Sequence, residues 1–250
     1  MSAGSKRDGE QAFLDEYDPH AYERPSVAVD VAVVSAVAGT LRTLLVRRTQ
    51  HPFRDSWALP GGFVAMDESL DHAAKRVLAD KARLRSVYLE QLYTFGEPQR
   101  DPRTRVISVA YYALVAASQI AGASLGETGP ILAELRIPWA GETGGPVQAL
   151  GADGQRLPLA FDHAHILGQA VLRMRGKLDY APIGFQMLGE TFTLLELQRV
   201  HETVLARPLN KDSFRRRMLA SGLLEATGKM QTGVEHRPAE LYRFLHGSAV

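Results

Sequence analysis

The sequence of 250 residues contains no cysteine. Disulfides, thiolate zinc sites, iron–sulfur clusters and cysteine nucleophiles are therefore excluded, and the absence fits a reducing compartment. No apolar run reaches the roughly 18 residues that a membrane-spanning helix needs, and the polar first residues lack the hydrophobic stretch of a signal peptide. These absences predict a cytoplasmic protein that does not engage a membrane.

An excess of charge of one sign is also nearly absent, because the formal net charge is +1 at pH 7. The balance is uneven along the chain, however. Residues 161–250 hold 12 Lys and Arg against 9 Asp and Glu, and the stretch Arg207–Arg217 holds five basic residues against one acid, Asp212. Such a patch is either a solvated helix face or a surface for an anionic partner.

The remaining composition is that of a folded protein, with 45% hydrophobic residues and its 22 glycines and 13 prolines spread along the chain. The first half of the sequence has the pattern of an α/β domain. Apolar residues recur from Leu70 to Leu84 with helical spacing, and the acids that precede them suit the positive end of the helix dipole. Gly122–Gly151 is expected to form loops around a short strand near Trp139. Strands are expected at Val27–Val37, Leu41–Val46, Tyr88–Phe95 and Arg105–Ala116.

The second half predicts a winged helix-turn-helix. A helix over Phe161–Leu178 closes the first domain, and Ala181–Gly189 is interpreted as a linker. Helices at Leu194–Leu205 and Asp212–Ser221 are followed by strands at Leu223–Thr227 and Ala239–Phe244, which is the order of a winged helix. We therefore expect an N-terminal tail at 1–24, an α/β domain at 25–180 and a smaller winged-helix domain at 190–246.

The segment from Trp57 through the following helix resembles the Nudix box, in which a glycine, a glutamate, an arginine and three further acids stand at fixed spacing. Gly62, Glu68 and Arg76 match this spacing. The three positions expected to hold acids are Val77, Asp80 and Lys81, and Arg83 stands at the position expected to be glycine.

The three expected acids matter because residues at i, i+3 and i+4 share one helix face, where carboxylates can hold Mg²⁺ against a diphosphate. Here only Asp80 is acidic, and Lys81 brings a cation to the place of a metal ligand. We therefore predict no metal site, no required cofactor, no catalytic residues and no enzymatic activity. Periodicity alone favours an amphipathic helix with a charged outer face.

A wider resemblance covers nearly the whole chain. It is carried by the segments Arg24–Val27, Glu90–Gly96, Arg100–Arg103, Val109–Leu114, Leu159–His163, Phe192–Leu194, Phe214–Arg216 and Arg237–Phe244. These segments are similar to the Nudix-related transcriptional regulators (NrtR) and to their ADP-ribose pyrophosphatase-like relatives. The resemblance implies an α/β Nudix fold with a mixed sheet, followed by a winged helix. It also implies a homodimer that senses a nucleotide, commonly ADP-ribose, and binds a palindromic double-stranded DNA operator.

Candidate ligand contacts follow from this resemblance. The loop arginines could equally be solvated, and most aromatic residues are core by default, but cations near a glycine-rich loop suit an anionic ligand. His163 and His165 are two residues apart and so do not share a helix face, which argues against a metal site. The candidate ligand contacts are Arg47, Gly61, Gly62, Phe95, Arg100, Arg103 and Arg105.

Candidate DNA contacts lie in the second half. At 3.6 residues per turn, Arg216 points most directly away from the face that carries Phe214 and Met218, and Arg217 is partly turned toward the domain. The second helix of a helix-turn-helix enters the major groove, where arginine binds guanine or phosphate. The candidate DNA contacts are Thr193, Lys211, Ser213, Arg215, Arg216, Arg217, Lys229 and Arg237.

The sequence thus favours a ligand-responsive transcriptional repressor of NAD or related metabolism, whose effector is ADP-ribose or another NAD derivative. One alternative is a Nudix hydrolase of ADP-ribose or another nucleoside diphosphate derivative, with Glu68 and Asp80 holding a metal. A second is a nucleotide-binding scaffold, which would need the helix carrying Arg215–Arg217 to be buried or paired.

Overall fold

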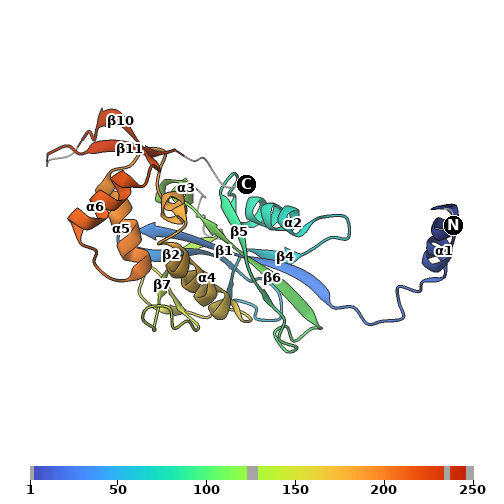
Figure 1. The fold of residues 1–250 in the computed structure, drawn as a ribbon. Helices are drawn as coiled ribbons and strands as arrows, with labels where there is room; N and C mark the ends of the chain where they lie inside the picture. Colours follow the sequence, from blue (N-terminus) through green and yellow to red (C-terminus); the bar gives the residue numbers. More distant parts are fainter. Residues whose placement is uncertain (1–2, 123–128, 234–236, 246–250) are drawn as a thin grey trace.

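A mixed β-sheet forms the centre of the molecule (Figure 1). The computed structural model describes residues 3–122, 129–233 and 237–245. The main path of the sheet has the order β5-β6-β1-β2-β7-β8-β9, while β3 pairs with β2 and β4 pairs with β1. The strands are β1 (Ser26–Val37), β2 (Thr40–Arg47), β3 (Trp57–Ala58), β4 (Gly61–Phe63), β5 (Tyr88–Phe95), β6 (Val106–Leu114), β7 (Ile131–Arg136), β8 (Gln148–Leu150) and β9 (Arg156–Leu157).

The sheet is mixed because β1 pairs parallel with β6 and antiparallel with β2. The turn between β1 and β2 consists of Ala38 and Gly39, whose φ angles are 50° and 80°. Two residues in the left-handed region give the twist that a tight hairpin needs. The strands expected at Val27–Val37 and Leu41–Val46 form this hairpin, and the two later strands, β5 and β6, pair antiparallel.

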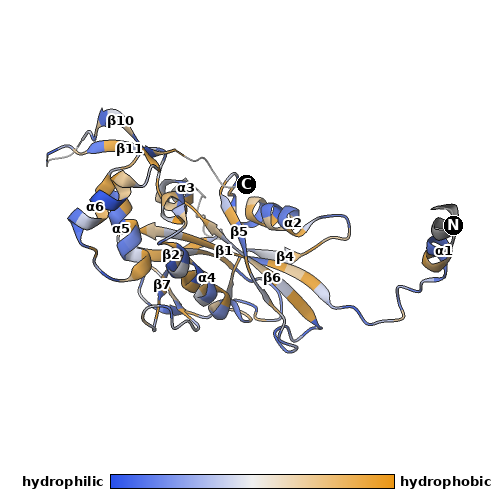
Figure 2. Ribbon diagram, viewed as in Figure 1, coloured by the Kyte–Doolittle hydropathy of each residue, from blue (hydrophilic) through white to orange (hydrophobic). Residues whose placement is uncertain are grey.

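Helices cover both faces of the sheet. Along β1, Val29, Val31 and Val33 face α2 (Leu70–Val77), the π-helical turn η1 (Leu78–Ala82) and α3 (Ala117–Gly122). The alternate residues Ala32 and Val34 face α4 (His163–Lys177) and the 3-10 helix η2 (Pro182–Met187), since side chains alternate along a strand. Figure 2 shows the apolar residues gathered along the central strands.

The winged helix comprises α5 (Leu194–Leu205), α6 (Lys211–Ala220), β10 (Leu224–Met230) and β11 (Glu240–Phe244). It has a small core of its own, to which Phe192, Leu197, Phe214, Met218 and Tyr242 belong. The far end of α5 belongs to a different core, because Val200 and Val204 pack in the cluster beneath the main sheet. One helix therefore lies in the cores of both domains.

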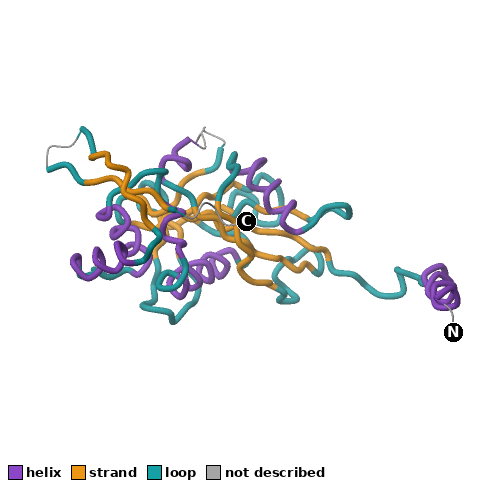
Figure 3. Tube along the Cα trace, turned by 45° about the horizontal axis from the view of Figure 1, so that its top comes forward, coloured by secondary structure: helices purple, strands orange, loops and turns teal. Residues whose placement is uncertain are grey.

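Two expectations about local structure were wrong. The segment Ala181–Gly189 is not a free linker, because η2 buries Ile183, Phe185 and Met187. Instead of one strand near Trp139, β7 and β8 form on either side of it, and the Trp139 indole donates to the Gly145 carbonyl at 3.1 Å. The N-terminal tail contains a 14-residue helix, α1 (Ala3–Glu16), which lies at the opposite end of the molecule from the β10–β11 wing (Figures 1 and 3). In the described part of the chain, no helix has the length and apolarity needed to cross a membrane.

Helix α5 begins with a capping box that should contribute measurably to stability. The Thr193 hydroxyl accepts from the Glu196 amide at 3.2 Å, and the Glu196 carboxylate accepts from the Thr193 amide at 2.7 Å. Thr193→Ala is expected to lower the free energy of unfolding by about 1 kcal/mol in urea denaturation. Thr203→Ala on the same helix is the control, because the exposed Thr203 hydroxyl only bonds back to the Arg199 carbonyl, and a loss below about 0.5 kcal/mol is expected. Equal losses would contradict a stabilising cap.

Candidate functional site

A cleft of about 510 Å³ opens where the end of β2, the Gly61–Gly62 turn of β4 and the loop after β5 meet the start of α4. Its walls carry many charged groups. Those that line it include Asp30, Arg47, Arg48, Lys81, Arg100, Asp101 and Arg103, together with Gly61, Gly62, Phe161 and His163.

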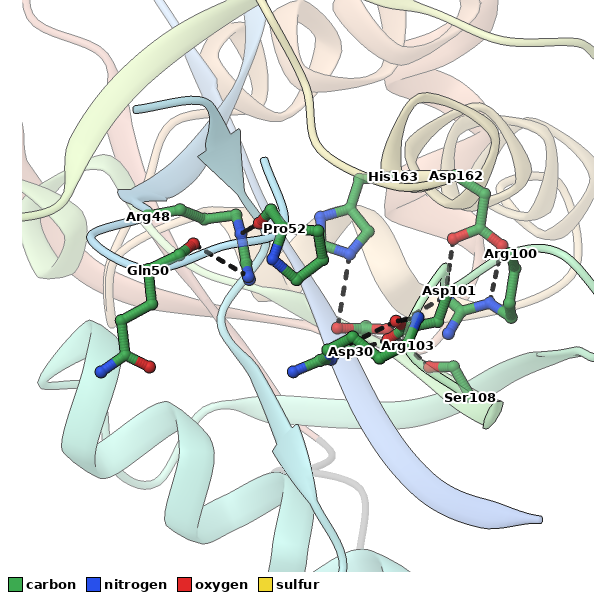
Figure 4. A network of polar contacts seen from close by, with 10 residues as sticks. All are labelled: Asp30, Arg48, Gln50, Pro52, Arg100, Asp101, Arg103, Ser108, Asp162 and His163. Atoms are coloured by element: carbon green, nitrogen blue, oxygen red, sulfur yellow. Dashed lines mark hydrogen bonds and ion pairs between the residues drawn. The ribbon is translucent and has the colours of Figure 1, made fainter. Parts of the chain in front are cut away.

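The floor of the cleft is a buried polar network centred on Asp30 (Figure 4). Its carboxylate accepts from the Ser108 hydroxyl at 2.6 Å and lies 3.5 Å from Arg100 Nη2. Arg100 also donates twice to Asp162, at 2.6 and 2.9 Å. Arg100 is therefore committed to carboxylates of the protein, although the sequence suggested it for the ligand.

His163 completes this network in its neutral form. Its Nδ1 accepts from the Leu59 amide at 2.9 Å, and its Nε2 lies 3.5 Å from Asp30. Burial lowers the pKa of His163 and outweighs the opposing charge of Asp30, so the ring is uncharged at pH 7. His163 therefore holds the backbone amide of Leu59 in place at the cleft.

Two of the other candidate arginines, Arg47 and Arg103, also have acidic partners. Arg47 lies 3.2 Å from Asp55, and both side chains are exposed. Arg103 donates to Asp101 at 2.7 and 3.0 Å, and its guanidinium lies 5.4 Å from the centre of the Phe63 ring. These two arginines nevertheless line the cleft with Gly61 and Gly62, so their contact with a ligand stays a prediction.

The structure does not bring Phe95 or Arg105 to the cleft. Phe95 packs against Tyr93, with ring centres 5.4 Å apart, and against the core on the α4 side of the sheet. Arg105 is exposed and donates to the Gly96 carbonyl at 2.6 Å. Both residues flank the loop between β5 and β6, and only the middle of that loop turns toward the cleft.

The cleft residues that sequence reasoning missed include Asp30, Arg48 and Phe161, as well as Lys81 in the role of a ligand contact. The Arg48 guanidinium lies 4.7 Å from the centre of the Phe161 ring and donates to the Pro52 carbonyl at 2.8 Å. The alternation of β2 could have indicated Arg48, because it continues the series of Leu44 and Val46, which face the α2 side of the sheet. Phe161 adopts a φ of 52°, which no sequence pattern signals.

The residues at the expected metal position do not fit Mg²⁺. Val77 is 1% exposed in the core, and the Lys81 ammonium donates to the Gly61 carbonyl. Glu68 is paired with Arg76, whose hydrogen bond lowers the pKa of Glu68 to about 2. Within the described ranges, no group of three or more His, Asp or Glu residues could hold a metal ion.

The candidate DNA surface lies on α6 and the wing. Lys211, Ser213, Arg215 and Arg216 are all exposed along α6. Arg216 has no ion pair with any described residue, whereas Arg217 lies 3.6 Å from Asp179 and over the Phe214 ring. Lys229 on β10 and Arg237 in the connection before β11 are exposed as well.

Thr193 is the exception among these candidates. Its side chain is 3% exposed, and its hydroxyl is held in the capping box of α5. The structure therefore does not place it on the exposed surface with the basic residues.

Comparisons with known proteins identify both parts of the chain. Residues 184–244 match the NrtR DNA-binding winged helix domain, and residues 25–134 match the NUDIX domain. An ADPR responsive transcriptional repressor of Acinetobacter baylyi is 37% identical, covering 98% of this chain and 92% of that protein.

Solved structures agree with this assignment. The crystal structure of Shewanella oneidensis NrtR complexed with a 27mer DNA has a TM-score of 0.71 and 37% identity, over 87% of this chain and 93% of that one. A MutT/nudix family protein from Enterococcus faecalis shares the fold, with a TM-score of 0.75 and 24% identity over 98% of this chain and 99% of that one.

Proposed function

The chain belongs to the NrtR family of Nudix-related transcriptional regulators, and from this premise we propose that it is a nucleotide-responsive transcriptional repressor. The effector is ADP-ribose or a related NAD derivative, bound in the cleft of the Nudix domain. The operator is palindromic DNA, bound by a homodimer through the winged helices, because a two-fold protein matches a two-fold site. Such a repressor works in the cytoplasm, beside the DNA that it controls.

One observation carries this proposal: α4 connects the cleft with the winged helix. Asp162 and His163, at its start, belong to the floor of the cleft. Near its other end, the buried Arg175 donates to the carbonyl of Val204 in α5 at 2.9 Å and to that of Gly141 at 2.6 Å. A change in the cleft that moves α4 therefore moves a helix of the DNA-binding domain.

The contact between the domains leaves room for such a movement. A hollow of about 1120 Å³ lies between the β1–β2 turn and α5. A ligand regulates DNA binding only if it binds two domain arrangements with different affinity, and a partly open interface permits a second arrangement.

Release of operator DNA by ADP-ribose is the test of this function. A labelled operator fragment, selected from genomic DNA by the full chain, is titrated with protein, and fluorescence anisotropy is followed as ADP-ribose is added. A coupling of 1–3 kcal/mol would weaken operator binding by roughly 5- to 150-fold. Unchanged operator affinity at millimolar ADP-ribose would remove ADP-ribose as the effector.

Hydrolysis of ADP-ribose should be absent or trace. Val77 and Lys81 cannot act as anionic metal ligands, and Glu68 is already paired with Arg76. Formation of AMP from ADP-ribose with Mg²⁺ or Mn²⁺, followed by chromatography, is expected to remain at the level of a protein-free blank. A turnover number near the enzyme median of about 10 per second would instead support the hydrolase alternative.

A further inference from the structure

Two cations in the Nudix cleft have no carboxylate partner among the residues that the structure describes. Arg47, Arg100 and Arg103 each have a carboxylate oxygen within 4.0 Å. In the described part of the chain, Lys81 and Arg48 make no such ion pair, and the hydrogen bonds recorded for them go to neutral backbone carbonyls. The positive charge of these two residues is therefore available to an anion that enters the cleft.

Lys81 stands where a metal-binding acid would stand in a hydrolase of this fold. It lies on η1, where the helix widens into a π-helical turn, and its exposed side chain donates to the Gly61 carbonyl of β4, which also lines the cleft. An ammonium group is a compact cation with three donors, so it can neutralise and bond phosphate oxygens as a metal ion does. The same ammonium repels a divalent cation.

Arg48, which directly follows β2, supplies the second charge. The Arg48 guanidinium lies 4.7 Å from the centre of the Phe161 ring, and the Arg103 guanidinium lies 5.9 Å from the same ring centre. Burial, and then the like charge of Arg103, lower the pKa of Arg48. An anion bound between the guanidinium groups of Arg48 and Arg103 would offset the repulsion between their positive charges.

We propose that Lys81 and Arg48 together replace the divalent metal of this fold and hold the diphosphate of the ligand without any metal ion. Two unpaired positive charges match the two negative charges that a nucleoside diphosphate bridge carries. Lys81 acts from the helix side and Arg48 from the β2 side. The inference rests on the proposed function only in taking a diphosphate as the anion.

Calorimetric titration of the full chain tests this proposal with two probes, inorganic pyrophosphate and ADP-ribose. Each is titrated in EDTA and again in Mg²⁺. The affinity in EDTA is expected to be at least as high as in Mg²⁺ for both probes. Lys81→Met and Arg48→Met are each expected to weaken binding about 10- to 100-fold, which is the loss of a hydrogen bond to a charged group.

Two further variants separate charge from structure. Lys81→Arg keeps the charge and should retain most of the affinity. Lys75→Met removes an exposed cation from α2, outside the residues that line the cleft, and should bind both probes as the unmodified chain does. Thermal melting checks that all variants are folded.

The outcomes are distinct. Binding of either probe only with Mg²⁺, no binding of pyrophosphate in EDTA, or equal affinity of Lys81→Met and the unmodified chain would each overturn the proposal. Metal-free binding of pyrophosphate that depends on Lys81, without binding of ADP-ribose, would support it while rejecting ADP-ribose as the effector.

Discussion

Arg100→Met is expected to lower the free energy of unfolding by about 3–5 kcal/mol, because it leaves carboxylates of a buried network without their cation. The Arg100 side chain is 4% exposed, and its partners Asp30 and Asp162 are 11% and 19% exposed. Water therefore cannot take over the role of the guanidinium. Urea denaturation followed by circular dichroism measures the loss.

The matched control is Arg105→Met, from the same loop. Arg105 is exposed and donates to one backbone carbonyl, that of Gly96. Its replacement should change stability by no more than about 0.5 kcal/mol. Similar losses in the two variants would mean that the Asp30 network does not hold the cleft together.

This pair of arginines shows the limit of sequence reasoning about the site. The spacing of Arg100, Arg103 and Arg105 gives no indication that the first is buried, the second paired at the cleft wall and the third outside it. Those differences depend on the path of the loop and on acids distant in sequence, above all Asp30 and Asp162. The glycine turn and the departures from the Nudix box, in contrast, were readable because they depend on local spacing.

The fold was predictable where local signals and burial agree. Helix α5 was expected over Leu194–Leu205 and has those bounds, because Thr193 caps its start and Ala206, with a φ of 53°, ends it. The segment Ala181–Gly189 was misjudged because Pro182 and Gly184 indicate a loop. Ile183 and Met187 of η2 are buried in the core beneath the main sheet, whereas Phe185 is buried in the winged-helix core. This burial depends on tertiary context that a local pattern lacks.

Arg216→Ala should weaken operator binding more than any other single change on α6. Arg216 is exposed and has no ion pair in the described part of the chain, whereas Arg217 is paired with Asp179. If Arg216 reads a guanine edge, the loss is about 1–3 kcal/mol and confined to one operator position. If it contacts a phosphate, all sequences weaken alike and the salt slope falls by about 1.

Lys211→Ala should weaken binding of all DNA sequences alike, as expected for a phosphate contact. Lys211 is the first residue of α6, next to the cap Asn210, and this position favours contact with the DNA backbone over contact with base edges. Arg136→Ala is the control. Arg136 is an exposed arginine at the end of β7, in the Nudix domain, without an ion pair among the described residues. Fluorescence anisotropy across a salt titration, with a genomically selected operator, compares the three variants. Equal affinity of the Arg216 and Arg136 variants would show that this face of α6 is a solvated surface, and it would favour a nucleotide-binding scaffold over a repressor.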